Sequence, residues 1–471
     1  MNRRSLLAAT AALTALPVHP QAAAFSTEDL AHAARLRDLG LADGEAWRLV
    51  QQLCNEVGAR PAGSAGDAKA VAWAQAAMQR LRLNNVRAEA LPVRVWQRGP
   101  ASARLVGPVS EPLVMAALGN SVAAPEGGIE ADVAWYPDFA ALKSDTSDRA
   151  RGRIVFIDQK TERTRDGRGY GQAVAARGLG AIEAARRGAV ALGIRSIGTS
   201  GARDGEPVAH TGAMRYELGL PRIPAFAVSV PDADRLAALH GEGKTLRLKL
   251  QLQARGDVEA TTHNVIAEVP GGDLAHEIVL ISAHLDSWDL GVGALDDGAG
   301  VAIVTAAAAL LRRAAKTPRR TIRVVLFGNE ENGFDGAHAY GARYKDQAHQ
   351  LVAESDFGAG RVYALRGRVQ SQALPLVETM AATLAPLGVA WPTDEANTGT
   401  PGPDAAVLMR RHRWPALQLS QDGSAYFDVH HTAHDTLDRI DPATLPQNVA
   451  CWAVCAWLAA QSPLPFGPPP L

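Results

Sequence analysis

The stretch from Ile278 to Asp297 constrains the possible fold most. Its apolar start, Ile278 to Ile281, predicts a buried strand, and Ala-His-Leu-Asp, a glycine-rich loop and the acidic pair Asp296-Asp297 follow. A long apolar helix is predicted next, at about 301–312. Strand, loop and helix in this order are typical of open α/β sheets, whose sites form at the carboxyl ends of the strands. Imidazole and carboxylate groups on such a loop indicate a divalent-metal site.

The alternation of strand and helix continues on both sides of this stretch. The strand predicted at 322–327 is apolar except for Arg323, as expected when helices cover both faces of a sheet. The sequence therefore predicts an α/β protein, a three-layer α/β/α sandwich with a mostly parallel sheet. Further elements are predicted as a strand at 264–269 and helices at 43–57, 67–83, 337–344, 374–384 and 446–460.

A segment with a different pattern of residues interrupts this alternation of strand and helix. Its short β-like runs, among them 154–157 and 223–228, are separated by glycine-rich turns and predict an inserted β-rich domain. The predicted segments are 1–24 (export signal), 25–104 and 259–461 (the two parts of the α/β domain), 105–258 (the insert) and 462–471 (a proline-rich tail).

The first residues form a targeting segment. Arg3 and Arg4 precede a small-residue apolar run from Leu6 to Leu16, and three alanines ending at Ala24 offer a cleavage site. The arginine pair resembles a bacterial twin-arginine signal, and an ordinary secretory signal is the alternative. We predict an exported protein, periplasmic or secreted after cleavage near Ala24.

The composition argues against two other classes of protein. A formal net charge of −1 does not fit an electrostatic nucleic-acid binder. Beyond the N-terminus no apolar run approaches the ~18 residues of a membrane span. The three cysteines, Cys54, Cys451 and Cys455, lack the spacing of a zinc site, and we predict core thiols, with one disulfide as the alternative.

Ionisable residues also cluster after other apolar runs. Glu330 and Glu331 follow the strand at 322–327, Asp356 follows a short apolar pair, and three histidines lie within residues 430–434. Each cluster has an ordinary explanation by itself, such as a surface turn, a histidine-rich loop or a helix N-cap at Asp297.

Together the clusters supply two histidines, two aspartates and a glutamate. This set of ligands suits two zinc ions that share one bridging carboxylate, and it leaves a second glutamate as general base. Asp286, two residues after His284, is placed to orient that imidazole by accepting its second N–H.

Four segments resemble a known family in order and spacing. AHLDSWDLGVGALDDGAG, GNEENG, ESD and HHTAHDT are similar to motifs of the co-catalytic zinc exopeptidases, which include aminopeptidases and glutamate carboxypeptidase-like enzymes. GARPAGS supports this, and HTGAMRYELGLPRIPAFAVSV in the insert looks like part of a protease-associated domain. The resemblance covers nearly the whole mature chain. It implies a homodimeric zinc metallopeptidase that hydrolyses dipeptides or short peptides by a metal-bridged hydroxide.

The resemblance also implies the metal ligands. Asp296 bridges two zinc ions per chain, His284 and Asp356 complete one ion, and Glu331 and His431 complete the other. His431 is favoured over its neighbour because the family's ligand histidine stands four residues before an Asp-Thr pair.

The remaining roles follow from the same resemblance. Glu330 is the general base and acid, Asp286 orients His284, and His430 helps to hold the scissile carbonyl oxygen. The peptide bond between the two adjacent aspartates is cis in members of the family.

Substrate preference stays open at this level. A site for a free amine needs an acidic group and a site for a free carboxylate needs a cation, and the sequence does not place Arg60, Arg215 or Asp404 near the metals. The loop from His210 to Tyr216 is a weaker candidate for substrate contact. Alternatives are an aminopeptidase acting on longer peptides, a glutaminyl-cyclase-like enzyme, and a non-catalytic exported binding protein with a structural zinc site.

Overall fold

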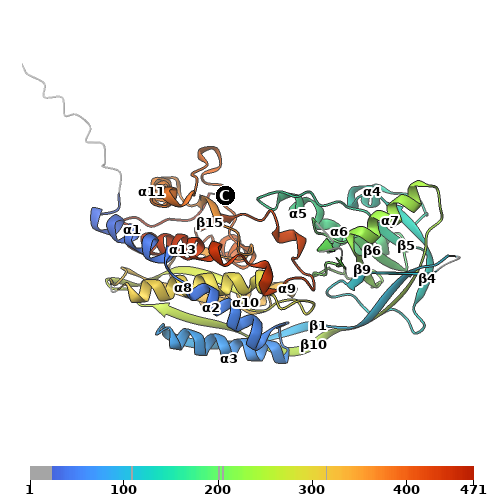
Figure 1. Cartoon of the computed structure of the whole chain (residues 1–471), viewed down its shortest axis with the longest axis horizontal. Helices are drawn as coiled ribbons and strands as arrows, with labels where there is room; N and C mark the ends of the chain where they lie inside the picture. Colours follow the sequence, from blue (N-terminus) through green and yellow to red (C-terminus); the bar gives the residue numbers. More distant parts are fainter. Residues whose placement is uncertain (1–23, 108–109, 200–201, 204–205, 315, 471) are drawn as a thin grey trace, which may run out of the picture.

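The chain folds into two bodies that lie side by side (Figure 1). This computed structural model describes residues 24–107, 110–199, 202–203, 206–314 and 316–470. Two long antiparallel strands, β1 (Asn84–Leu105) and β10 (Arg247–Val269), form a ribbon that runs from one body into the other. The predicted export signal lies outside the described residues, apart from Ala24.

The left-hand body of Figure 1 contains a mostly parallel sheet, as the sequence predicts. Its strand order is β14-β15-β13-β11-β12-β10-β1. The four strands β15, β13, β11 and β12 are parallel, whereas β14 and the ribbon are antiparallel to their neighbours. The strands are β11 (Leu274–His284), β12 (Arg320–Phe327), β13 (His349–Glu354), β14 (Val362–Arg368) and β15 (Ala416–Gln421).

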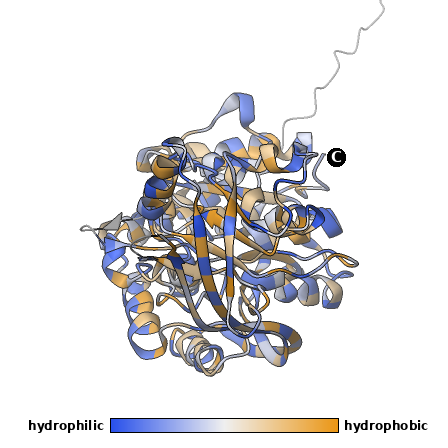
Figure 2. Cartoon of the chain, turned by 90° about the vertical axis from the view of Figure 1, so that its right-hand side faces the viewer, coloured by the Kyte–Doolittle hydropathy of each residue, from blue (hydrophilic) through white to orange (hydrophobic). Residues whose placement is uncertain are grey.

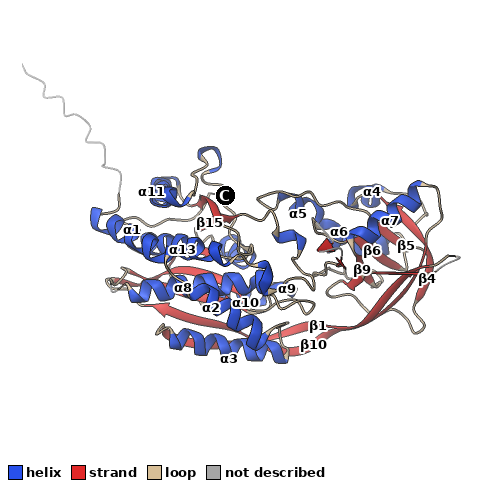
Figure 3. Cartoon of the chain, viewed as in Figure 1, coloured by secondary structure: helices blue, strands red, loops and turns tan. Residues whose placement is uncertain are grey.

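Helices cover both faces of this sheet, which confirms the predicted three-layer sandwich (Figure 3). One group of helices shares a large core with the first face, and α10 and α12 cover the second face. The first group is α1 (Thr27–Leu41), α2 (Glu45–Gln52), α3 (Ala65–Arg80), α8 (Ala299–Arg313), α11 (Leu374–Leu384) and α13 (Leu445–Gln461). The others are α9 (Glu330–Gly333), α10 (Asp335–Arg343) and α12 (Pro403–His412).

Strand β12 shows why the sheet needs two covering layers. Ile322, Val324 and Leu326 enter the core beneath α8 and α13, and the alternate residues Val325 and Phe327 enter the core beneath α10 and α12. Successive side chains of a strand point to opposite faces, so an apolar run without alternation buries both faces. Each such side chain contributes about 1.5–3 kcal/mol on burial.

Helix α8 lies in the interior except at its carboxyl end, where Arg312 and Arg313 are exposed. Within the described residues, the stretch Ala294–Arg313 is long and apolar enough to cross a membrane, and its apolar part is buried. Burial of this kind is what a core helix shows, and α8 packs against α13, α2 and β11.

The three cysteines confirm the prediction of core thiols. Cys54, Cys451 and Cys455 are buried and form no disulfide. Burial raises the pKa of Cys54 to about 11, which keeps that thiol protonated.

The right-hand body contains most of the predicted insert, together with the adjoining part of β1. Its sheet has the order β10-β4-β5-β6-β9-β3, with β4, β5, β6 and β9 parallel. Figure 2 faces this body and shows hydrophilic and hydrophobic residues alternating along central strands, as in the first part of β10, where exposed and buried residues alternate. The strands are β2 (Glu111–Leu113), β3 (Met115–Ala117), β4 (Ile129–Tyr136), β5 (Ile154–Ile157), β6 (Ala191–Arg195), β7 (Ala202–Arg203), β8 (Glu206–Pro207) and β9 (Ala225–Val228).

Among the described residues of the insert, four helices accompany these strands, so the insert contains α-helical as well as β structure. They are α4 (Phe139–Ser144), α5 (Arg168–Ala173), α6 (Ala175–Arg186) and α7 (Val230–Gly241). Strands β1 and β10 pass without a break through the predicted borders at 104/105 and 258/259. The exact domain limits therefore stay a prediction.

Candidate metal centre

The predicted site residues gather at one edge of the parallel sheet. His284 ends β11, Glu330 and Glu331 follow β12, and Asp356 follows β13. The loop after β15 carries His431. Because these four strands are parallel and adjacent, their carboxyl ends meet. Glu330, Glu331, Asp356 and His431 line one cavity of about 960 Å³ there.

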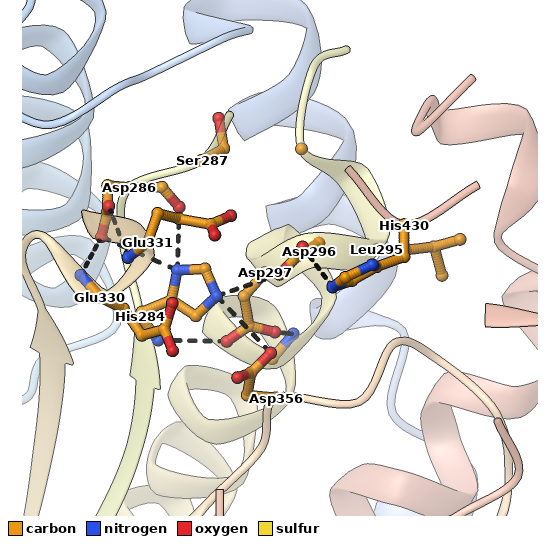
Figure 4. A network of polar contacts seen from close by, with 12 residues as sticks. His284, Asp286, Ser287, Leu295, Asp296, Asp297, Glu330, Glu331, Asp356 and His430 are labelled. Carbon is orange, nitrogen blue, oxygen red and sulfur yellow. Dashed lines mark hydrogen bonds and ion pairs between the residues drawn. The ribbon is translucent and has the colours of Figure 1, made fainter. Parts of the chain in front are cut away.

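Asp296 occupies the middle of the group (Figure 4). His284 Nε2 lies 3.1 Å from Asp296 Oδ1, and His431 Nε2 lies 3.1 Å from Asp296 Oδ2. Each histidine therefore faces a different oxygen of the same carboxylate, which is the arrangement a bridging ligand requires.

Two further carboxylates complete the group. Asp356 Oδ1 lies 3.5 Å from His284 Nε2, and Glu331 Oε2 lies 3.1 Å from His431 Nε2. The five side chains thus form two sets that share Asp296.

The polar atoms of this group fit a metal. Glu331 Oε1 is buried without a hydrogen-bond partner, and His431 Nε2 approaches Asp296 Oδ2 without forming a hydrogen bond to it. Buried carboxylate oxygens left without donors are costly unless a cation satisfies them. Two imidazoles and three carboxylates are the nitrogen and oxygen donors that zinc accepts.

The electrostatics lead to the same conclusion. Burial lowers the pKa of His431, but the carboxylates of Glu331 and Asp296 outweigh burial and raise that pKa to about 9. For His284, burial likewise opposes Asp356, Asp286 and Asp296, and the pKa ends well above its usual value. Without metal both rings carry protons, so metal uptake releases protons.

The peptide bond between Asp296 and Asp297 is cis, as the resemblance implies. The carboxylate of Asp297 also lies close to His284 and Asp356. Its two oxygens accept hydrogen bonds from the backbone N–H groups of His284 (3.1 Å) and Gly300 (3.1 Å). Asp297 thus links the end of β11 to the start of α8.

Asp286 acts through a different atom from the one that the sequence suggests. His284 Nδ1 lies 3.0 Å from the backbone carbonyl of Asp286, whereas the Asp286 carboxylate is 3.8 Å away. That carboxylate accepts the backbone N–H groups of Glu330 (3.0 Å) and Glu331 (3.4 Å). The backbone therefore orients the histidine, and the side chain orients the glutamate pair.

Glu330 lines the cavity beside the five clustered residues. It begins α9 after Asn329, whose left-handed backbone (φ 62°) turns the chain sharply at the end of β12. Burial, reinforced by Glu331 and Asp356, raises the pKa of Glu330 well above its usual value. A carboxyl group of raised pKa is suited to accept and return a proton.

His430 stacks on His431, with ring centroids 3.5 Å apart. Its Nε2 lies 3.6 Å from Asp296 Oδ2, farther than that of His431, and its Nδ1 is buried without a partner. Burial lowers the pKa of His430 well below its usual value. His430 is therefore a neutral ring at the cavity wall, and His431 is the better placed ligand.

Two buried groups that support the centre were not assigned this role from the sequence. Asp435 accepts the backbone N–H groups of Leu295 (2.7 Å) and Asp296 (3.2 Å). Arg60 donates to the carbonyls of Leu285, Val292 and Gly293, at 2.6, 2.8 and 2.9 Å. Both hold the loop between β11 and α8, and only their long-range contacts identify them.

The residues considered as binding partners for the ends of a substrate differ in whether they line the cavity. Arg60 is fully buried in backbone contacts, and Asp404 is buried against Glu354, so neither lines the cavity. Arg215 does line it. His210 is buried and its Nδ1 contacts the carbonyl of His430 at 2.8 Å, which is a structural contact.

The insert reaches the metal centre directly. Thr211 donates its backbone N–H to the carbonyl of His431 (3.0 Å), and its own carbonyl lies 3.3 Å from His431 Nδ1. A carbonyl that accepts the Nδ1 proton leaves the Nε2 lone pair for a metal. This partner of a ligand histidine comes from a segment 220 residues earlier in the sequence.

Comparison with known sequences finds peptidases. The model of peptidase family M28 matches residues 264–456. Carboxypeptidase Q of Xenopus laevis is 32% identical over 427 residues, which cover 89% of this chain and 87% of that protein. Carboxypeptidase Q of Homo sapiens is 32% identical over 423 residues, which cover 89% of this chain and 86% of that protein.

Comparison with solved structures agrees. The peptidase M28 precursor from Shewanella amazonensis SB2B matches with a TM-score of 0.90 and 44% identity, over 94% of this chain and 99% of that chain. BSAP, a zinc aminopeptidase from Bacillus subtilis, matches with a TM-score of 0.61 over 88% of this chain and 93% of that chain. At 19% identity the second match shows a shared fold.

Proposed function

The chain belongs to peptidase family M28 and is a zinc metallopeptidase, and from this premise we propose that it is an exported di-zinc exopeptidase that hydrolyses dipeptides or short peptides. The observation that carries the proposal is Glu330. Glu330 lines the same cavity as four of the five clustered donors, Asp296, Glu331, Asp356 and His431, yet it is not needed to complete either set of ligands. A purely structural zinc site needs no such base, which argues against the binding-protein alternative.

We assign the ligands as two sets. His284 and Asp356 would hold one zinc ion and Glu331 and His431 the other, and the carboxylate of Asp296, which lies between the two sets, would serve both. When bound, the ions supply an acidified water and polarise the peptide carbonyl.

The chain's own residues carry the proton and hold the substrate. Glu330 accepts a proton from the attacking water at its carboxylate and returns it to the leaving amine. His430, neutral in its buried position, faces the scissile carbonyl oxygen from the cavity wall. Asp286 fixes Glu330 by accepting its backbone N–H.

Substitution Glu330→Gln tests the assignment, because the amide keeps the size of the side chain but cannot accept the proton. The variant should retain zinc, measured by elemental analysis, and lose about 10²–10⁴-fold in kcat on unblocked dipeptides. Glu56→Gln, at an exposed position remote from the cavity, serves as the matched control. Near-normal turnover of the Glu330 variant would remove Glu330 from the mechanism.

Substrate length and end preference are part of the same proposal. A panel of dipeptides with free, N-blocked and C-blocked ends separates a dipeptidase from an aminopeptidase, because an aminopeptidase tolerates the C-terminal block and longer peptides. Export is tested by fractionating cells that produce the full chain, and the mature protein should begin near Phe25.

A further inference from the structure

Arg177 of the insert is a buried cation in the cavity of the metal centre. The residue is 8% exposed and lies on α6, and its side chain lines the cavity with Glu330, Glu331 and His431. Among the residues that the structure describes, it forms no ion pair. A buried guanidinium without a carboxylate partner is costly, so a missing partner is indicated.

The guanidinium of Arg177 is held in place, but only some of its N–H groups donate hydrogen bonds. Nη2 donates to the hydroxyl of Tyr170 at 2.7 Å, and Nη1 makes a long contact of 3.4 Å with the carbonyl of Thr211. Nε is buried without a hydrogen-bond partner. Tyr170 is itself fixed by stacking on Phe427, with ring centroids 4.4 Å apart. Arginine offers five N–H donors, and a pair on one edge fits the two oxygens of a carboxylate.

The position of Arg177 suits the end of a very short substrate. Nη1 lies 3.4 Å from His431 Nδ1, so one imidazole ring separates it from Asp296 and Glu331. A fully extended dipeptide spans only about 7 Å. If its scissile bond lies at the metals, its terminal carboxylate must meet a group in the layer directly around the ligands.

The charges that line the cavity are divided between the two bodies. Within the described lining, the arginines are Arg177 and Arg215, and both belong to the insert. The carboxylates all belong to the flanking segments: Asp296, Glu330, Glu331 and Asp356. Positive charge therefore lies on the insert side of the cavity, and negative charge lies on the side formed by the sheet edge.

We propose that Arg177 binds the C-terminal carboxylate of the substrate and thereby sets a preference for peptides with a free carboxyl end. This rests on the proposed function, since it takes the scissile bond to lie at the metal centre. Arg215, exposed at the same wall, extends the positive field towards solvent. The insert then supplies specificity, and the sheet edge supplies the chemistry.

The test compares alanyl-leucine with its C-terminal amide, which removes only the charge. Wild-type protein should hydrolyse the free acid with a higher kcat/KM than the amide. In Arg177→Gln the kcat/KM for the free acid should fall about 10- to 100-fold, whereas the kcat/KM for the amide should change less than threefold. Arg177→Lys keeps the positive charge but lacks the paired N–H donors of the guanidinium, and it should recover part of the preference for the free acid. Arg186→Gln, on the same helix but paired with Glu183 and Glu217, should leave the preference unchanged.

Binding measured by calorimetry in the Glu330→Gln background separates this inference from the proposed function. If wild type cleaves neither compound, the proposed function fails, and the acid-to-amide ratio of Kd values still decides the role of Arg177. An unchanged ratio in Arg177→Gln overturns the inference. A parallel loss for acid and amide also overturns it, because it would make Arg177 a structural residue only.

Discussion

At the scale of single residues, the centre depends on groups that have no chemical role of their own. Asp435 and Arg60 hold the loop that carries Asp296 by bonding its backbone rather than its side chains. Burial raises the pKa of Asp435 to about 7, and its two backbone donors oppose that shift. The local sequence places both residues in family-like segments but does not show this role, since each acts on a backbone distant in the chain.

Gly212 is the residue whose substitution tests the contact between insert and metal centre. A Cβ there would lie 2.5 Å from Arg177 Nη1 and 2.7 Å from His431 Nδ1, and its φ of +130° disfavours any side chain. We expect Gly212→Ala to displace His431 and to reduce zinc affinity at least tenfold, measured as zinc retained after dialysis.

The matched control for this change is Gly219→Ala. Gly219 also has a positive φ (+87°), but a Cβ there meets no atom within 4 Å. The control should therefore show the cost of the backbone conformation without loss of zinc. Equal zinc retention in the two variants would show that Gly212 gives no support to His431.

At the scale of elements, the loop after β15 connects the insert to the metal centre. The carboxylate of Asp428, three residues before His431, accepts hydrogen bonds from both terminal nitrogens of Arg163 (2.6 and 3.0 Å) and from the hydroxyl of Thr199 (2.7 Å). Thr199 also donates its backbone N–H to Phe427, at 3.0 Å. The ligand loop is thus clamped to the insert at two consecutive residues, Phe427 and Asp428.

Substitution Asp428→Ala should loosen this clamp. Because Arg163 and Asp428 are partly exposed, each contact is worth only about 0.5–1 kcal/mol, and we expect a three- to tenfold loss in kcat/KM. Hydrogen exchange of residues 422–431 should rise at the same time. Asp273→Asn, which removes an exposed pair with Arg319 far from the loop, is the control. Unchanged exchange in Asp428→Ala would contradict the clamp.

At the scale of the whole molecule, the zinc ions should act as a stabilising ligand of the fold. Chelation leaves three carboxylates and two imidazoles buried together, and zinc at 100 times its Kd stabilises by about 2.7 kcal/mol. At about 2.1 cal/mol/K of unfolding entropy per residue, a chain of 471 residues changes its Tm by roughly 1 °C per kcal/mol. We expect the Tm to fall by about 3 °C for each ion removed by chelation and to recover with added zinc. An unchanged Tm would contradict the prediction that bound zinc stabilises the fold.

The same measurement has a predicted pH dependence. In metal-free protein the pKa of His431 is raised to about 9, above its unfolded value near 6.5. This pairing stabilises the metal-free fold below pH 6.5 and is lost as pH rises through 9. The Tm difference between zinc-loaded and metal-free protein should therefore increase from pH 6.5 to 9, which calorimetry at several pH values measures. A constant difference would contradict proton competition at the site.

The layered α/β fold and the candidate ligands are predictable from the sequence alone, because both depend on local patterns of residues. Unbroken apolar runs such as 322–327 predict strands buried on two faces, and polar residues directly after such runs must lie at one sheet edge. Three-dimensional contacts were needed to show which atom of Asp286 faces His284, and that Asp435 and Arg60 support the loop. They were also needed to show that Thr211 and Arg177 of the insert meet His431. Those contacts join segments up to 254 residues apart, and no local pattern encodes how two separately built bodies dock.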